Sequence, residues 1–182
     1  GYNDMDFIDS IKKVKDDSFA MASLPEETRN GALEAVARAL TENKAAIFEA
    51  NTRDMEAARE SSLAQPIINR LKFDEKKLAT CISGIYDLID LEDPLFKDLL
   101  KRQLDDDLIL TKTTCPIGVI GVIFESRPDA LVQIASLCIK SGNCIILKGG
   151  SEARNTNRAL FDVIYKACID SGLPEHFAVL IE

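Results

Sequence analysis

The spacing of hydrophobic and polar positions changes twice along this chain and divides it into three regions. Over about the first 95 residues, apolar side chains recur every three or four positions, as Leu33, Val36 and Leu40 illustrate. This period is typical of amphipathic helices whose apolar face packs against a core. We therefore expect residues 1–99 to form a helical segment whose apolar side chains serve packing.

Two helix starts are visible in this first region. Ser23, followed by Pro25 and Glu26, resembles a capping box with proline in the first turn of a helix. Asp74 is a favourable N-cap, and the apolar Phe73 stands directly before it. The sequence therefore predicts that helices begin near both positions.

The second region, residues 100–114, has a different pattern. Two arms that read as extended chain flank an acidic run, Asp105 to Asp107. Such a pattern favours a β-ribbon with a polar turn. Because the exposed backbone of a ribbon needs a cover, we expect another subunit to pack against it.

The third region, residues 115–182, alternates short apolar runs with helical patterns. The runs are rich in valine and isoleucine, as strands buried on both faces require. Their connections suit parallel neighbours. The fold class is therefore α/β: amino-terminal helices and then the first half, β-α-β-α-β, of a parallel doubly wound sheet. We expect strands at residues 117–124, 144–147 and 177–181.

A polar run of Lys148, Gly149, Gly150, Ser151 and Glu152 directly follows the second strand. Ligands of open α/β sheets bind beyond the carboxyl ends of the strands. Paired glycines allow close approach of the backbone, and free N–H groups at the next helix start favour phosphate. The lysine adds charge, and the serine and glutamate could hydrogen-bond a ribose. The alternative is an ordinary turn, since the run matches neither G-x-G-x-x-G nor the P-loop.

A second polar run, Glu125-Ser126-Arg127, follows the first strand. Arg127 suits phosphate or carboxylate through its planar guanidinium. Ser126 and neighbouring N–H groups could stabilise a developing oxyanion, or Ser126 could cap the next helix. The alternative to a binding role is a helix cap with a surface ion pair.

Composition narrows the functional classes. The net charge of −8, without a Lys/Arg-rich block, argues against nucleic acid or an anionic membrane as partner. No apolar run is long enough to span a bilayer, and the start of the chain lacks a signal-peptide pattern. The five cysteines form no C-x-x-C pair, which suggests buried free thiols in a reducing, cytoplasmic compartment. His176 is the single histidine, and we predict no metal site.

The run CPIGVIGVIFESRPDALVQIASLCIKSGNCIILKGGSEARNTN resembles the γ-glutamyl phosphate reductase family, the glutamate-5-semialdehyde dehydrogenases of the aldehyde dehydrogenase superfamily. PIGVIGVIFESRPD and LKGGSEA are the most specific stretches, and EANTRDMEAAR and INRLKF also fit. The resemblance covers essentially the whole chain, but only the amino-terminal part of such an enzyme.

This resemblance implies an aldehyde dehydrogenase-like dinucleotide-binding fold. It also implies NADPH-dependent reduction of L-glutamyl 5-phosphate to L-glutamate 5-semialdehyde, with phosphate release, in proline biosynthesis. Lys148 matches the lysine that contacts the adenosine ribose of the cofactor. Many NAD-using relatives carry an acidic residue three positions later, where this chain has Ser151. The displaced Glu152 therefore favours NADPH. Ser126 falls near the position of an oxyanion-stabilising asparagine, and Arg127 becomes the candidate for the substrate phosphate or carboxylate.

The resemblance places the nucleophilic cysteine in a later domain, in a motif of the type R-P-x-x-C-N that this chain lacks. We therefore expect no catalytic nucleophile and no reductase activity in residues 1–182 alone. Residues 115–182 would be the first half of the NADP-binding domain. A homo-oligomer through residues 102–114 and a functional link to glutamate 5-kinase are also implied. The alternative is a noncatalytic nucleotide-binding or assembly module with the front half of the fold, or a split enzyme completed by another chain.

Overall fold

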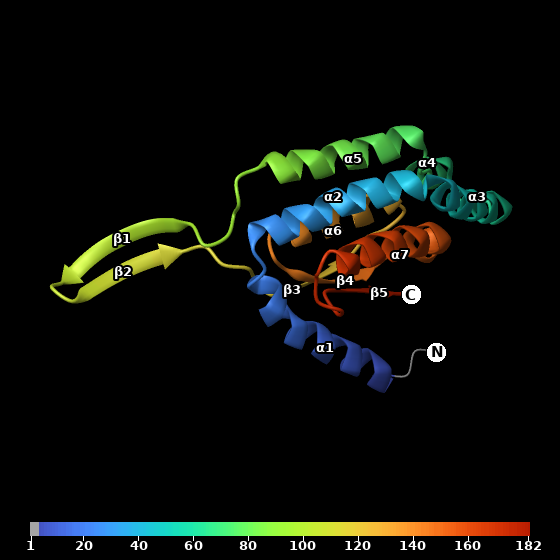
Figure 1. Cartoon of the computed structure of the whole chain (residues 1–182). Coiled ribbons are helices and arrows are strands. Elements are labelled where there is room, and N and C mark those ends of the chain that lie inside the picture. Colours follow the sequence, from blue (N-terminus) through green and yellow to red (C-terminus); the bar gives the residue numbers. More distant parts are fainter. Residues whose placement is uncertain (1–3) are drawn as a thin grey trace.

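The computed structural model describes residues 4–182 as a parallel sheet between helices, with a projecting antiparallel ribbon (Figure 1). The first helices are α1 (Asp4–Ala22), α2 (Glu26–Glu42), α3 (Lys44–Glu60), α4 (Gln65–Leu71) and α5 (Glu75–Asp90). The ribbon consists of β1 (Asp98–Asp105) and β2 (Leu108–Thr113). The remaining elements are β3 (Val119–Ile123), α6 (Pro128–Lys140), β4 (Cys144–Lys148), the 3₁₀ turn η1 (Ser151–Ala153), α7 (Arg154–Asp170) and β5 (Ala178–Ile181).

The sheet has the order β3-β4-β5, and both pairings are parallel. The predicted β-α-β-α-β arrangement is therefore confirmed. Side chains of β4 alternate between the two faces, as the pleat requires. Ile146 lies with Val179 against α1, whereas Ile145 and Leu147 are fully buried on the opposite face. The apolar runs of the sequence thus fill two separate interfaces of one sheet.

Helices cover the sheet in layers. In Figure 1, α1 lies on one side of the strands and α6 and α7 lie on the other. Helix α2 packs against α5, α6 and α7, and α3 packs against α7. The central position of α2 explains why Leu33, Val36 and Leu40 are fully buried. None of the helices described over residues 4–182 is long and apolar enough to cross a lipid bilayer.

Two local expectations about the elements are wrong. Pro25 is the N-cap of α2 and no side chain caps it, because the Ser23 hydroxyl donates backwards to the carbonyls of Phe19 and Ala20. Strand β3 is not buried on both faces, and Ile123 is 79% exposed. Ile123 is the last residue of β3 and pairs with the exposed Lys148, at the open carboxyl edge of the sheet. Asp74 does cap α5, accepting from the Lys77 N–H at 3.0 Å.

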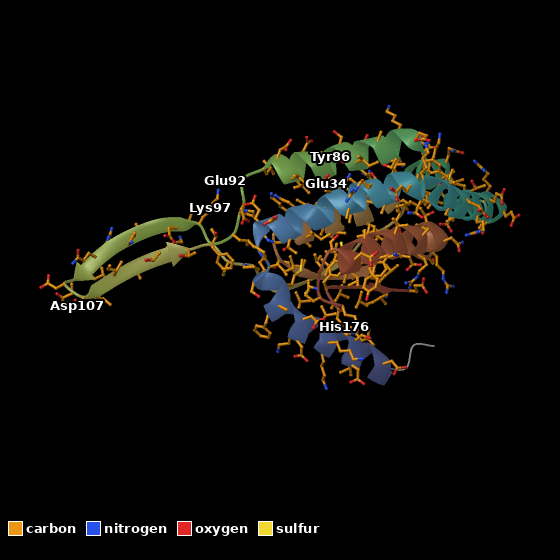
Figure 2. All side chains as sticks on the ribbon, in the orientation of Figure 1. Glu34, Tyr86, Glu92, Lys97, Asp107 and His176 are labelled. Atoms are coloured by element: carbon orange, nitrogen blue, oxygen red, sulfur yellow. The ribbon has the colours of Figure 1, made fainter. Side chains whose placement is uncertain are left out.

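The ribbon projects away from the body of the molecule, with Asp107 at its tip (Figure 2). It begins at Asp98, slightly earlier than expected. All of its residues are exposed, and its larger apolar side chains are between 41% and 60% exposed: Leu99, Leu100, Leu104, Leu108, Ile109 and Leu110. Apolar side chains displayed on a paired but uncovered ribbon are typical of a surface that packs against another chain.

A buried cation joins α2 to the segment before the ribbon. Arg29 is 1% exposed, and its guanidinium donates to the Lys140 carbonyl, to Asp93 Oδ2 at 2.8 Å and to the Leu24 carbonyl at 3.3 Å. A buried guanidinium is tolerable when its donors are matched in this way. Arg29 therefore fixes the end of α6 relative to the start of α2.

We expect Arg29→Ala to lower the free energy of unfolding by about 3 kcal/mol, because it leaves a carboxylate and two carbonyls without their donor. Urea unfolding followed by circular dichroism would measure the change. Arg38→Ala, an exposed arginine on the same helix, is the matched control and should change stability by less than about 0.5 kcal/mol. Equal losses of unfolding free energy in the two variants would show that the buried hydrogen bonds of Arg29 do not stabilise the fold.

Candidate functional site

The two polar runs predicted from the sequence meet at the carboxyl edge of the sheet. Lys148 ends the central strand and pairs in register with Ile123 of β3 and Ile181 of β5. A cavity of about 700 Å³ opens there, lined by Lys148, the glycine turn and the first residues of α7. An adjoining cavity of about 690 Å³ includes Ser126. The site therefore lies where ligands of open α/β sheets bind.

The paired glycines lie close to side chains of the chain itself. A Cβ atom on Gly149 would overlap the Asn157 amide, and one on Gly150 would overlap the Glu152 carboxylate. Asn157 is 3% exposed and lines the larger cavity, and its Oδ1 has no hydrogen-bond partner among residues 4–182. The Asn157 and Glu152 side chains thus pack tightly against the turn and fix the backbone that follows Lys148.

Glu152 connects the two runs. Its Oε1 accepts from the Ser126 N–H at 2.7 Å and from the Ser126 hydroxyl at 2.9 Å. Burial by itself raises the pKa of Glu152, but hydrogen bonds from its own N–H and from Ser126 outweigh burial and lower that pKa overall. Ser126 has a positive φ of 49°, an uncommon conformation for a residue other than glycine. The contact with Glu152 therefore holds this turn in place.

This contact changes the interpretation of Ser126. The expected helix cap is wrong, because Arg127 is the N-cap residue of α6 and no side chain caps the helix. Both polar groups of Ser126 that could stabilise an oxyanion already donate to Glu152. The Glu152 Oε1 atom is used by Ser126, so a hydrogen bond from Glu152 to a ribose would have to come from its Oε2 atom.

The start of α7 is occupied by a buried carboxylate from α3. Asp54 is 4% exposed; its Oδ1 accepts from the Asn155 N–H at 3.2 Å and its Oδ2 accepts from the Thr156 N–H at 2.7 Å. The Asn155 amide and the Thr156 hydroxyl donate to the same carboxylate at 2.9 and 2.6 Å. The expectation of free N–H groups for a phosphate at this helix start is therefore wrong for Asn155 and Thr156.

Asn51 completes this connection between α3 and α7. Its amide donates to the Leu71 carbonyl at 2.9 Å and to Thr156 Oγ1 at 3.1 Å, and it accepts from the Phe73 N–H at 2.9 Å. Sequence reasoning missed Asn51 and Asp54. The available signal was two polar residues three positions apart on an otherwise apolar helix face, which is where buried, satisfied polar groups stand out.

Of the two cations predicted for the site, Lys148 lines the first cavity, whereas Arg127 lines neither cavity. Lys148 and Arg127 are exposed, and within residues 4–182 neither side chain makes a hydrogen bond or ion pair. Arg154, which the sequence analysis did not single out, lines both cavities. It lies 3.7 Å from Glu182 Oε2, whereas Arg158 Nε donates to Glu182 Oε1 at 2.9 Å. The edge of the sheet thus offers positive side chains to an anionic ligand.

The four buried cysteines are poorly suited to nucleophilic chemistry. Four are buried and Cys115 is exposed, so the expectation of burial fails for Cys115. Burial raises the pKa of Cys138 to about 11 and that of Cys144 to about 12, and it raises that of Cys168 as well. Thiols with such pKa values stay protonated near neutral pH, where the thiolate is the reactive form.

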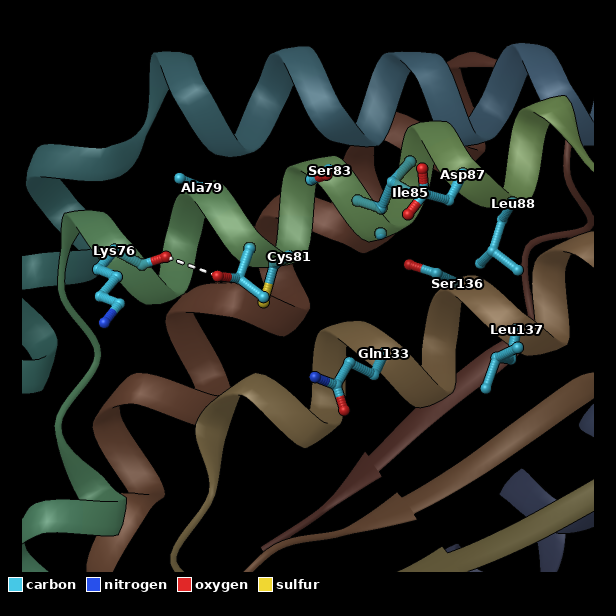
Figure 3. A pocket seen from close by; sticks show the side chains of 12 residues that line it. Lys76, Ala79, Cys81, Ser83, Ile85, Asp87, Leu88, Gln133, Ser136 and Leu137 are labelled. Atoms are coloured by element: carbon cyan, nitrogen blue, oxygen red, sulfur yellow. Dashed lines mark hydrogen bonds between the residues drawn. The ribbon is translucent and has the colours of Figure 1, made fainter.

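Cys81 lines a further cavity, of about 740 Å³, between α5 and α6 (Figure 3). Burial, and then the charge of Asp129, raise the pKa of this thiol to about 12.

His176 lies by the loop before β5, where its backbone N–H donates to Asp17 Oδ2 at 2.8 Å (Figure 2). That contact joins the loop before β5 to α1, and neither residue lines the two cavities at the glycine turn.

Comparisons with known proteins agree with this architecture. No protein-family model matches the chain. The γ-glutamyl phosphate reductase of Ruminiclostridium cellulolyticum is 54% identical over 165 residues, which are 91% of this chain and 38% of the relative. That of Pelotomaculum thermopropionicum is 51% identical over 178 residues, 98% of this chain and 41% of the relative. This chain is a homologue of the γ-glutamyl phosphate reductases. It spans about two fifths of the length of these relatives.

Solved structures extend the comparison. The γ-glutamyl phosphate reductase of Thermotoga maritima superimposes with a TM-score of 0.93 at 33% identity, covering 96% of this chain and 42% of that one. The γ-glutamyl phosphate reductase of Saccharomyces cerevisiae superimposes with a TM-score of 0.91 at 37% identity, and the match covers 96% of this chain and 45% of that one. A putative aldehyde dehydrogenase from Bacillus subtilis, 19% identical with a TM-score of 0.68 over 97% of this chain and 36% of that one, shares the fold. The matched region is the amino-terminal part of the reductase fold.

We expect Asp54→Ala to lower the free energy of unfolding by about 3 kcal/mol, because two N–H groups and a hydroxyl lose their acceptor. Chemical denaturation would measure this change. Glu56→Ala is a matched control that removes a carboxylate from the exposed face of the same helix. A loss below about 0.5 kcal/mol in Asp54→Ala would contradict the capping role.

Acid should weaken the contact between Glu152 and Ser126. Because the folded-state pKa of Glu152 lies below its ordinary 4.5, its stabilisation is present above that pH and is lost as the pH falls through the folded pKa. The stability difference between the parent and Glu152→Gln should therefore shrink as the pH falls below about 4.5. Urea titrations at a series of pH values test this, and a constant difference into the acid range would contradict it.

Proposed function

We propose that this chain provides the front of the nicotinamide-cofactor site in a γ-glutamyl phosphate reductase. In the complete enzyme, L-glutamyl 5-phosphate is reduced to L-glutamate 5-semialdehyde with NADPH, and phosphate is released, in proline biosynthesis. The observation that carries the proposal is the high identity to reductases across nearly the whole chain. The cavity at the strand ends supports it, because a dinucleotide needs such an opening.

The residues present fit a dinucleotide. Lys148, at the end of β4, would contact the adenosine ribose, and Gly149 and Gly150 keep the backbone beside it free of side chains. Ser151 is exposed beside them and can hydrogen-bond the same sugar. The Glu152 carboxylate stays charged, but it contacts Ser126 and does not line the cavity of Lys148. These features favour NADPH, which would supply the hydride, and the chain's own groups bind and orient it.

Arg127 is the proposed contact for the acyl phosphate or the carboxylate of the substrate. It lies exposed at the start of α6, one residue after Ser126. A guanidinium binds either anion through two parallel hydrogen bonds. Ser126 would add a donor to a developing oxyanion if a bound substrate displaced Glu152. Because an acyl phosphate is made by phosphoryl transfer to a carboxylate, glutamate 5-kinase is the proposed functional partner.

The ribbon over residues 102–114 is the proposed oligomerisation arm. Its exposed leucines and isoleucine are the apolar surface that a second copy would cover. Residues 1–99 would belong to the cofactor domain as a helical segment, and residues 115–182 would form its first half. The nucleophilic cysteine is proposed to lie in a further domain, within the R-P-x-x-C-N type of motif that the resemblance implies, and the raised pKa values of the four buried thiols make those four poor candidates.

We expect Lys148→Ala, in the whole polypeptide that carries this sequence, to raise the Kd for NADPH about tenfold, or ~1.4 kcal/mol. The rate of the chemical step should change less, because the lysine contacts the ribose and not the reacting atoms. Fluorescence titration of NADPH and single-turnover kinetics separate the two effects. Lys166→Ala, near the far end of α7, is the control. An unchanged NADPH affinity in Lys148→Ala would show that this lysine does not contribute to binding the cofactor.

A further inference from the structure

A phosphate group at this edge of the sheet has fewer backbone donors than the sequence suggested. The Asn155 and Thr156 N–H groups at the start of α7 are both bound to the buried Asp54 carboxylate. That carboxylate also opposes the positive end of the helix dipole. A phosphate monoester bound beside α7 would therefore depend more on cationic side chains than the sequence suggested.

Arg154 is the side chain placed for this task. It is the first residue of α7 and lines both the cavity of Lys148 and the adjoining cavity of Ser126. Its side chain is 67% exposed, so it can turn toward a ligand without breaking a packed contact. Within the described chain, the cavity at the end of β4 is lined by two cationic residues, Lys148 and Arg154.

The ion pair of Arg154 can be exchanged at small cost. Its Nη2 lies 3.7 Å from Glu182 Oε2, a long contact between exposed groups, which contributes little. Glu182 keeps its 2.9 Å hydrogen bond from Arg158 when Arg154 moves. That bond and the charge of Arg154 hold the pKa of Glu182 low, against the effect of burial, so the carboxylate stays charged and paired. A phosphate dianion would be the stronger partner for Arg154.

The carboxylates around the cavity leave room for this anion. Glu152 is bound by Ser126 and Glu182 is bound by Arg158. Glu125 lines both cavities and remains as the acidic group without such a partner in the described chain. In the cavity of Lys148, the two cations Lys148 and Arg154 balance the carboxylates of Glu125 and Glu182, so an anion would be received by the cationic side chains themselves.

We propose that Arg154 is the specificity residue that distinguishes NADPH from NADH by binding the 2′-phosphate of the adenosine ribose. The inference rests on the proposed function, because it takes the cavity as the adenosine site. Arg154 and the phosphate form a charge-assisted, bidentate pair, and Lys148 contacts the sugar from the strand end. NADH lacks the phosphate, so Arg154 contributes to NADPH binding and not to NADH binding.

The test compares Arg154→Gln with Arg158→Gln in the whole polypeptide. Both variants remove a guanidinium that pairs with Glu182, but Arg158 does not line either cavity. The Kd values for NADPH and for NADH are measured separately by fluorescence titration at fixed salt. Arg154→Gln should raise the Kd for NADPH about tenfold and leave that for NADH within about twofold. Arg158→Gln should change neither value by more than about twofold.

Three results would overturn the inference. Equal losses of NADPH and NADH affinity in Arg154→Gln would mean a structural role, and equal effects of the two variants would mean a diffuse charge effect. Unchanged NADPH affinity in Arg154→Gln would show that Arg154 does not bind the 2′-phosphate. Arg154→Lys, which keeps the charge but loses the planar fork, should lie between the parent and the glutamine variant. If the parent protein bound neither cofactor, the proposed function would fail as well, which a failure confined to Arg154 would not imply.

Discussion

The buried carboxylate of Asp54 is the interaction on which the arrangement of the site depends. It lies on α3, about a hundred residues before the glycine turn, and accepts four hydrogen bonds from Asn155 and Thr156. A charge at 4% exposure is tolerable when it is so fully satisfied. Because α7 begins at that point, the carboxylate fixes both the direction of the helix and the position of the turn that precedes it.

The turn is held from its other side by a second carboxylate. Glu152 accepts from the N–H and the hydroxyl of Ser126, so the ends of β3 and β4 are joined by side chains as well as by the sheet. Gly149 and Gly150 allow this because any Cβ atom there would overlap Asn157 or Glu152. Two anions that the chain itself supplies thus shape the backbone around a cavity proposed to bind an anionic cofactor.

The carboxylates of Asp54 and Glu152 hold the turn in place, whereas the cationic side chains nearby are the groups that can bind a ligand. The Asn155 and Thr156 N–H groups at the start of α7 are used by Asp54, and the exposed cations beside them can face a ligand. Lys148 stands at the strand end and Arg154 at the helix start, so a ligand in the cavity would lie near both. Such side chains discriminate between ligands by charge and geometry, whereas a helix dipole attracts any anion.

The sequence by itself determined the local elements: the period of apolar positions gave the helices, the valine- and isoleucine-rich runs gave the parallel strands, and the glycine pair marked the turn after Lys148. These signals are local, because each depends on neighbours within a few residues. Tertiary structure alone decided which polar groups remain free. Asp54 meets Thr156, and Ser126 meets Glu152, only after α3, β3 and α7 have packed together. No spacing along the chain records those contacts, because the partners are separated by whole elements and are brought together by burial of apolar faces elsewhere.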